Sequence, residues 1–305
     1  MNPYWGKGFL QFFALLIDRI RSGEIFVSPV SDELQLFALI GISIACSLIG
    51  AFLVLQRMTM LANSLSHTMI LGIVGIFLFT GDFTLSITSL LIAAFFTALL
   101  TALLTHALTH TVKLQEDASI GLVFTTLFAV GIVLITLFTR DAHVGTEVVL
   151  GNLEILDNND MHLIWIAAAI DIGAFLLFYK EFKLVAFDPL LATSMGVSRT
   201  LFGAFLMILT SITAVAAFRA VGVLLVLAFL VVPPVIARLW TNRLLPLLFL
   251  SALFGILCSL FGVALSRHIL SAYHLPLSTA GIVVTLLGLL FAVSAFTWQP
   301  ERKAR

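Results

Sequence analysis

A few polar side chains interrupt the long apolar runs of this chain, and their types suit metal binding. Asn63 and His67 stand four residues apart in the stretch LANSLSHTMILG, so a helix would carry both on one face. A neutral imidazole is a good ligand for zinc, manganese or iron, and an amide oxygen is a poorer one. The same spacing also suits hydrogen bonds between neighbouring helices. The pair is a candidate metal site, with interhelical hydrogen bonding as the alternative.

Asp171 is the only carboxylate deep inside an apolar run, IWIAAAIDIGAFLLF. A charge at the bilayer centre costs about 2.5–3.5 kcal/mol on insertion scales, so such a group coordinates a cation, lines a wet cavity or pairs with a neighbouring helix. His106 and His110 repeat the four-residue spacing near the end of another run, where it suits either a two-histidine metal site or ordinary solvated side chains. The residues alone leave these alternatives open.

The elements that carry these residues must be membrane helices. The chain is 61% hydrophobic and 10% charged with a mean hydropathy of +1.15, whereas soluble domains carry roughly 25% charged residues. Continuous apolar runs, rather than short alternating segments, exclude a transmembrane barrel. Nine runs are long enough to span a bilayer: 36–55, 60–80, 84–108, 119–138, 161–179, 200–218, 220–237, 244–266 and 277–298. The sequence therefore predicts an all-α integral membrane protein with about nine transmembrane helices.

Some local signals refine this prediction. Pro233 and Pro234 should kink or break the seventh helix, because proline removes a backbone donor and clashes with the preceding turn. The segment FLQFFALLI near the N-terminus is too short to span and is followed at once by Asp18 and Arg19, which favours a short interfacial helix over a cleaved signal peptide. Cys46 and Cys258 lie in separate apolar runs and are expected to act as small hydrophobic residues.

Charge distribution predicts the orientation and excludes several functions. With nine spans, ten of the 16 Lys and Arg residues fall on one side, which the positive-inside rule makes cytoplasmic; the N-terminus is then outside and the C-terminus inside. The formal net charge of zero gives no indication of nucleic-acid binding. No P-loop is present, so ATP would have to be handled by another chain. Residues 1–305 read as one transmembrane domain, with 1–35 an extracytoplasmic segment and 180–199 a cytoplasmic loop.

Several ordered motifs resemble the permeases of zinc, manganese and iron ABC transporters. LQRMTMLANSLSHTMILGI resembles the second-helix motif of that family, and QEDASIGLVFTTLFAVGIVLI and VLGN resemble two later ones. LVAFDPLLATSMGVSRTL is similar to the family's coupling region, and AVGVLLVLAFLVVPPVIARLWTNRL to the helix after it. The resemblance covers about residues 36–298.

The resemblance implies a permease subunit in the bacterial cytoplasmic membrane that has no catalytic residues and no permanently bound cofactor. An extracytoplasmic metal-binding protein delivers a divalent ion, and cytoplasmic ATP-binding subunits drive its import through a permease dimer. His67 matches the family's metal-path histidine. The family's aspartate four residues earlier is Asn63 here, so the site lacks a negative charge. Asp171, or a second and non-identical permease chain, is expected to supply the missing carboxylate.

Two cytoplasmic segments complete the expectations. Asp188 as N-cap, Pro189 at the first helical position and Gly196 beyond the end predict a short helix, which with Phe187 would dock on the ATPase. Glu116 and Asp117 should cap the fourth span favourably and act as an exit or gating pair. The competing functions are a secondary metal transporter driven by an ion gradient, which usually needs more intramembrane ionisable groups, and a membrane enzyme or receptor.

Overall fold

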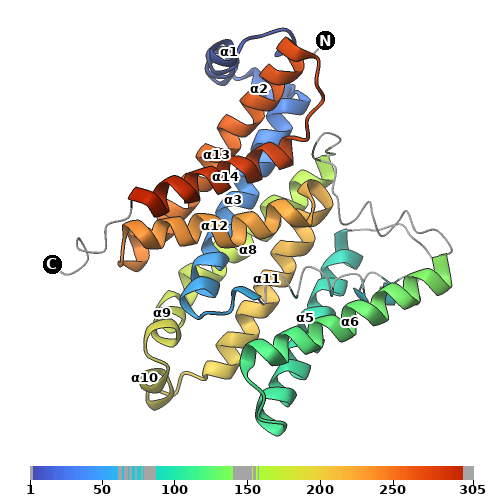
Figure 1. Ribbon diagram of the computed structural model, residues 1–305, viewed down its shortest axis with the longest axis vertical. Coiled ribbons are helices and arrows are strands. Elements are labelled where there is room, and N and C mark those ends of the chain that lie inside the picture. Colours follow the sequence, from blue (N-terminus) through green and yellow to red (C-terminus); the bar gives the residue numbers. More distant parts are fainter. Residues whose placement is uncertain are drawn as a thin grey trace.

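The computed structural model is helical throughout the part of the chain that it describes, residues 3–60, 64, 68, 71–72, 74–76, 78, 87–139, 153, 156 and 158–297 (Figure 1). The helices are α1 (Phe9–Ser22), α2 (Glu24–Val27), α3 (Ser31–Leu55), α5 (Ile87–Thr111), α6 (Glu116–Thr139), α8 (Asn158–Leu177), α9 (Tyr179–Phe187), α10 (Pro189–Ser194), α11 (Arg199–Val221), α12 (Val223–Trp240), α13 (Leu244–Tyr273) and α14 (Thr279–Thr297).

Seven helical segments within the described residues are long and apolar enough to cross a membrane, which confirms the all-α membrane class. They are Ser31–Leu55, Ala118–Phe138, Asp160–Leu177, Arg199–Phe218, Val223–Trp240, Leu244–Tyr273 and Thr279–Thr297. Each overlaps a predicted span. Of the other two predicted spans, most of 60–80 lies outside the described residues, and 84–108 corresponds to α5 from residue 87 onward.

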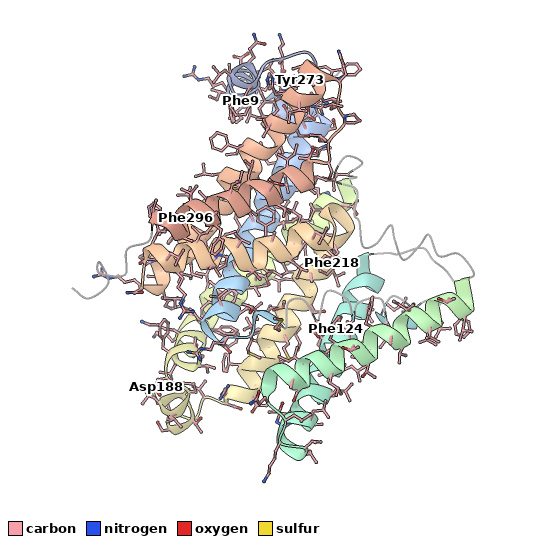
Figure 2. All side chains as sticks on the ribbon, in the orientation of Figure 1. Phe9, Phe124, Asp188, Phe218, Tyr273 and Phe296 are labelled. Atoms are coloured by element: carbon pink, nitrogen blue, oxygen red, sulfur yellow. The ribbon has the colours of Figure 1, made fainter. Side chains whose placement is uncertain are left out.

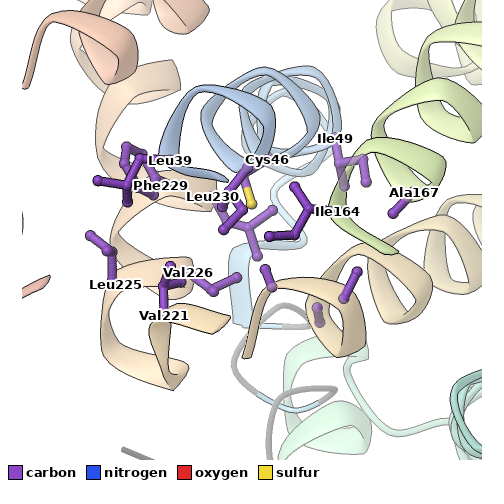
Figure 3. Close-up of a cluster of buried hydrophobic side chains, with 14 of the residues drawn as sticks. Leu39, Cys46, Ile49, Ile164, Ala167, Val221, Leu225, Val226, Phe229 and Leu230 are labelled. Carbon is purple, nitrogen blue, oxygen red and sulfur yellow. The ribbon is translucent and has the colours of Figure 1, made fainter. Parts of the chain in front are cut away.

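Helix α3 lies at the centre of the bundle, in contact with α8, α12 and α13. Its inward side chains, among them Cys46 and Ile49, meet Ile164 and Ala167 of α8 and Leu230 of α12 (Figure 3). A Cβ atom built on Gly50 would lie 2.8 Å from the carbonyl carbon of Leu230, so the backbones of α3 and α12 touch at this point. The core therefore requires glycine at position 50.

The proline pair does not break its helix. Helix α12 runs from Val223 through Pro233 and Pro234 to Trp240, so the predicted break is wrong, and the alternative of a kink stays a prediction. Both prolines are buried, and beyond them Arg238 donates a hydrogen bond to the backbone carbonyl of Val54 in α3 at 3.4 Å. Tertiary packing thus holds the last turns of α12 in place and outweighs the backbone bonds that the prolines remove.

The real interruption of this region comes earlier, at Gly222. This residue alone separates α11 from α12 and has φ +81° and ψ 163°, a backbone conformation that is essentially restricted to glycine. Its N–H donates to the carbonyl of Phe218 and so closes the last turn of α11. The predicted spans 200–218 and 220–237 are therefore two helices that meet at a one-residue corner.

The N-terminal segment covers one end of the bundle. Arg19 of α1 donates to the Glu33 carboxylate at 2.6 Å, and the Tyr4 hydroxyl donates to it at 2.7 Å. Burial and the adjacent Glu33 raise the pKa of Tyr4 above the ordinary tyrosine value. Asp32 pairs with Arg267 of α13. Because these acids are paired, α3 begins at Ser31, five residues before the predicted start of the span at 36.

The two ends of the molecule carry different elements. Phe9 of α1 and Tyr273 at the end of α13 lie at one end, and Asp188, just before α10, lies at the opposite end (Figure 2). Helices α5 and α6 stand to one side, where α5 packs on α11 and α6 packs on α5. The α9–α10 pair thus lies at the end of the molecule remote from the N-terminal segment.

Candidate functional site

The predicted metal motif falls in the second span, and both Asn63 and His67 lie outside the described residues. The neighbouring Ser64 and Thr68 are described, helical and almost fully buried. The Ser64 hydroxyl has no hydrogen-bond partner. Further along, a Cβ on Gly72 would lie 2.9 Å from the carbonyl oxygen of Ala93, so this segment packs closely on α5. Ser64 and Thr68 are thus buried polar residues in a segment that packs on α5.

Asp171 lies in the interior of the helix bundle. Its side chain is fully buried, and Oδ2 accepts a hydrogen bond of 2.5 Å from the Thr213 hydroxyl of α11. The other oxygen, Oδ1, has no partner. This contact links α8 to α11. It is the kind of interhelical hydrogen bond that membrane helices use in place of hydrophobic attraction.

The surroundings of Asp171 help to decide whether it coordinates a cation or pairs with a neighbouring helix. Neither of the two described cavities is lined by Asp171. Among the described residues, no group of three or more His, Cys, Asp or Glu side chains comes together in a way that would hold a metal ion. The geometry of the described part favours the pairing alternative. Thr213 was missed by sequence reasoning, since which helix Asp171 faces depends on packing.

Glu116 and Asp117 occupy the first two positions of α6, as predicted from their place before the apolar run. A hydrogen bond of 2.9 Å from the Ser119 N–H to the Gln115 carbonyl closes the first turn of this helix. Acidic residues in the first turn oppose the positive end of the helix dipole favourably. Their side chains lie outside the described atoms, so the gating role stays a prediction.

The short helix predicted after Asp188 is present as α10. The Asp188 side chain accepts a hydrogen bond of 3.0 Å from the Leu191 N–H, and Pro189 occupies the first position of the helix. Gly196, with φ +81°, follows the helix end, where its N–H donates to Thr193 and the Val197 N–H donates to Ala192. These bonds satisfy the last carbonyls of α10 in a Schellman arrangement. The local prediction from Asp188, Pro189 and Gly196 is confirmed.

A helix that the sequence did not indicate holds α10 in place. Helix α9 precedes it within the predicted 180–199 loop, and its Phe182 is fully buried. Around Phe182 lie Phe52 of α3, Phe175 of α8 and Phe202 and Phe205 of α11, with ring centroids 4.9–5.8 Å away. Aromatic pairs at such distances each add about 0.5–1.5 kcal/mol beyond burial. The α9–α10 pair is thus fixed to the membrane helices by a phenylalanine cluster.

Several apolar side chains are exposed on the α9–α10 pair, next to polar ones such as Lys183 and Ser194. Leu190 is 85% exposed and Met195 66% exposed, and Phe187 is 53% exposed just before the cap. The buried Ala192 is the residue by which α10 packs on the rest of the chain. An apolar surface of this kind, held on a capped helix at the end of the bundle, is suited to insertion into a groove of another protein.

His106 lies on α5 and lines a cavity between α5 and α11, and the side chain of His110 is outside the described atoms. Arg199, at the first position of α11, lines the same cavity. Arg199 is one of the ten Lys and Arg residues on which the predicted orientation is based, and the sequence indicates no other role for it. Its position next to α5 follows from the packing of α11 on α5 and has no local sequence signal.

Comparison with known proteins identifies the family. The family model described as the ABC 3 transport family matches residues 34–298, which is most of the chain. This chain belongs to the ABC 3 transport family. The match includes the helices from α5 to α14, with the α9–α10 pair among them, and α3 except for its first three residues.

Curated relatives of this ABC 3 family chain are similar over most of their length. A probable metal transport system membrane protein of Chlamydia trachomatis is 40% identical over 295 residues, which cover 96% of this chain and 93% of the relative. The manganese transport system membrane protein MntD of Bacillus subtilis is 39% identical, covering 85% and 89%. The zinc transport system membrane protein TroD of Treponema pallidum is 36% identical, covering 86% and 72%.

A solved structure shares the fold of this ABC 3 family chain. PsaBC from Streptococcus pneumoniae, in complex with Fab, superposes with a TM-score of 0.76 at 24% sequence identity, covering 96% of this chain and 98% of that one. The arrangement of helices around α3 is thus a fold already seen in a solved structure.

Proposed function

We propose that this chain is the transmembrane permease of a binding-protein-dependent ABC importer that moves a divalent transition metal, manganese, zinc or iron, across the bacterial cytoplasmic membrane. The observation that carries the proposal is the family match over residues 34–298, together with relatives named for metal transport. The chain is a transport subunit, and ATP hydrolysis takes place on a partner. It holds no permanent cofactor, and the metal is its cargo.

The ATPase partner docks on α10. Support for this step comes from the capped, six-residue helix at the end of the bundle, with Leu190 and Met195 pointing outward. The phenylalanine cluster around Phe182 gives this helix a firm connection to α3, α8 and α11. Movement imposed on α10 by ATP binding is therefore passed to the membrane helices. Asp188, Pro189 and Gly196 set the shape of the docking helix, and Phe187 adds to its apolar surface.

The cargo path follows the second span, with His67 as the ligand and Asn63 as its weaker neighbour. The buried, unpartnered hydroxyl of Ser64 supports a polar interior along this segment. Glu116 and Asp117, at the first turn of α6, form the cytoplasmic exit or gate. The carboxylate that the Asn63 position lacks comes from a second, related permease chain or from Asp171. The sealed contact of Asp171 with Thr213 supports the first of these two sources.

The full chain has nine transmembrane helices, with the second span and α5 added to the seven membrane-length segments. The N-terminus and α1 are extracytoplasmic, and the C-terminus is cytoplasmic. In this orientation the α9–α10 pair lies on the cytoplasmic side. Lys180 and Lys183 of α9 and Arg199 at the start of α11 are then cytoplasmic, as the positive-inside rule requires. Two permease chains, identical or related, assemble with two ATPase subunits and receive the ion from an extracytoplasmic binding protein.

The test combines copurification with transport. The complex is purified through a C-terminal tag, and uptake of radioactive manganese, zinc and iron is measured in vesicles with and without ATP. We expect an ATPase to copurify and uptake to require ATP. Leu190→Glu should remove both, because it puts a charge into an apolar contact. Leu275→Glu, a change of a 55% exposed leucine at the other end of the bundle, is the matched control and should keep both.

The outcomes separate the competing functions. ATP-independent uptake that follows an imposed ion gradient would establish a secondary transporter instead. If an intact, ATPase-bearing complex took up none of the metals, the proposal that it imports manganese, zinc or iron would be wrong. If Leu190→Glu retained the ATPase as well as the control does, docking on α10 would be wrong while the transporter class stood. His67→Ala should abolish uptake without loss of the ATPase, because it removes only the cargo ligand.

A further inference from the structure

A row of threonine side chains follows one face of α5. Thr97, Thr101 and Thr105 stand four residues apart, so each lies about one turn further along the helix than the one before. All three are buried, at 4%, 0% and 4% exposure. We call these three residues the threonine ladder. The rest of the helix is mainly Ala, Leu and Phe, so the ladder puts polar groups on the buried face of a mostly apolar helix.

The ladder begins where α5 touches the second span. A Cβ atom built on Gly72 would lie 2.6 Å from the methyl carbon of Thr97 and 2.9 Å from the carbonyl oxygen of Ala93. Successive spans cross the membrane in opposite directions, and each residue of a helix rises about 1.5 Å. The step back from Gly72 to Ser64 therefore corresponds to an equal step forward along α5, to the turn after Thr101. The ladder thus runs alongside the stretch of the second span in which the sequence places the metal motif.

Two hydroxyls of the ladder lack hydrogen-bond partners. Those of Thr101 and Thr105 are buried without a hydrogen bond to any described residue, although Thr97 and Thr109 on the same helix donate to the carbonyl four residues earlier at 2.8 Å. Ser64, at the same level of the second span, also has a buried hydroxyl that bonds to none of the described groups. Buried polar groups are almost always satisfied by protein, water or an ion. Three unpaired hydroxyls at one helix contact therefore indicate a place for a polar guest.

The far end of the ladder borders open space. A step of four residues turns the face of a helix by about 40°, so the ladder turns gradually away from the second span. Its last member, Thr105, lines a cavity of about 460 Å³ between α5 and α11, together with Thr109 and Met207. This cavity lies at the end of the bundle that also carries α10 (Figure 1). The ladder thus joins the level of the metal motif to a cavity at the end proposed above to be cytoplasmic.

The chemistry of the ladder suits a hydrated metal ion. A hydroxyl oxygen has two lone pairs that accept hydrogen bonds, and water bound to a divalent metal is a strong donor because the ion lowers its pKa. Neither α5 nor the stretch 60–80 contains Lys or Arg, so these two segments bring no basic side chain to their contact. We propose that Thr101 and Thr105 form one wall of the cargo path, where their hydroxyls accept hydrogen bonds from the water shell of the passing ion. This inference rests on the proposed function and adds to it two residues of α5 that have no metal-binding signal in the sequence.

Substitutions that keep the side-chain shape test this wall. Thr101→Val and Thr105→Val remove only the hydroxyl, so ATP-driven uptake of manganese, zinc or iron should fall about tenfold, equivalent to ~1.4 kcal/mol. The unfolding midpoint should stay level or rise, because an unpaired buried polar group is lost. Thr101→Ser keeps the hydroxyl and should keep uptake. The matched control is Thr125→Val on α6, where the exposed hydroxyl is bonded to the Gly121 carbonyl at 2.7 Å, and uptake should not change.

Cysteine labelling tests the same wall without measuring uptake. Both native cysteines are buried, so Thr101→Cys and Thr105→Cys introduce the thiols that a water-soluble thiosulfonate can reach. We expect both to be modified during ATP turnover, and more slowly when manganese, zinc or iron is added, whereas the rate for Thr125→Cys should not respond to metal.

The outcomes separate this inference from the proposed function. Uptake in Thr101→Val and Thr105→Val equal to that in Thr125→Val would overturn the inference, as would labelling that all three metals leave unchanged. If the wild-type complex imports no metal, the proposed function fails. Protection of the two cysteines by metal would then still support the wall, and its absence would overturn it.

Discussion

The contact between Asp171 and Thr213 leads to a prediction that separates a structural carboxylate from a metal ligand. Asp171→Asn keeps an oxygen that can accept from the Thr213 hydroxyl, now 2.5 Å from Oδ2. The side chain can be oriented so that the new amide nitrogen takes the place of Oδ1, which has no hydrogen-bond partner, while the amide oxygen stays next to Thr213. We expect the unfolding free energy to change by less than about 0.6 kcal/mol, the average for an interhelical hydrogen bond. Metal uptake should stay within about twofold, equivalent to ~0.4 kcal/mol.

Two further variants measure the bond itself. Asp171→Leu and Thr213→Val each remove it with little change of volume, and each should cost about 0.6–1.7 kcal/mol. The double variant should cost little more than the larger of the two, because the same bond is lost only once. The assay is denaturant unfolding in mixed micelles, followed by circular dichroism, with uptake measured in parallel. Loss of uptake in Asp171→Asn, with assembly and unfolding free energy intact, would refute the structural role and make Asp171 the missing carboxylate.

Three other results are expected. Gly50→Ala should cost about 1–3 kcal/mol in unfolding, because its Cβ would collide with the Leu230 carbonyl, whereas Gly173→Ala, with open space around position 173, should be neutral or stabilising. Phe182→Ala should cost about 3–5 kcal/mol, measured in the same unfolding assay, since the ring is fully buried. Because the folded protein raises the pKa of Tyr4, its stability contribution is complete below about pH 10 and falls at higher pH; Tyr4→Phe should flatten that dependence in pH-dependent unfolding.

Local signals in the sequence predicted local structure well. The apolar runs gave the class of the protein and seven of its spans, because lipid leaves few alternatives to a helix. Asp188, Pro189 and Gly196 gave the beginning and end of α10, since capping depends on neighbours in the chain. Cys46 and Cys258 are buried free thiols, as expected from their apolar surroundings.

Features that depend on tertiary packing were not predictable in this way. Pro233 and Pro234 favour a break when only the local backbone is considered, yet burial and the Arg238 contact with α3 keep α12 continuous. The predicted start of the first span at residue 36 left out Asp32 and Glu33, which pair with Arg267 and Arg19 respectively at the beginning of α3. The candidate site divides in the same way. The local capping of α10 is confirmed, whereas the metal-binding role of Asn63 and His67 stays a prediction from the sequence.

The one-residue corner at Gly222 has a mechanical consequence. Any change in the angle between α11 and α12 must be taken up by the φ and ψ of this residue, because no other residue separates the two helices. Helix α11 begins beside α10, and α12 touches the central helix α3 at Gly50. Gly222 is therefore the hinge at which rotation of α11 either reaches the centre of the bundle or is absorbed, and a side chain at this position would stiffen that hinge.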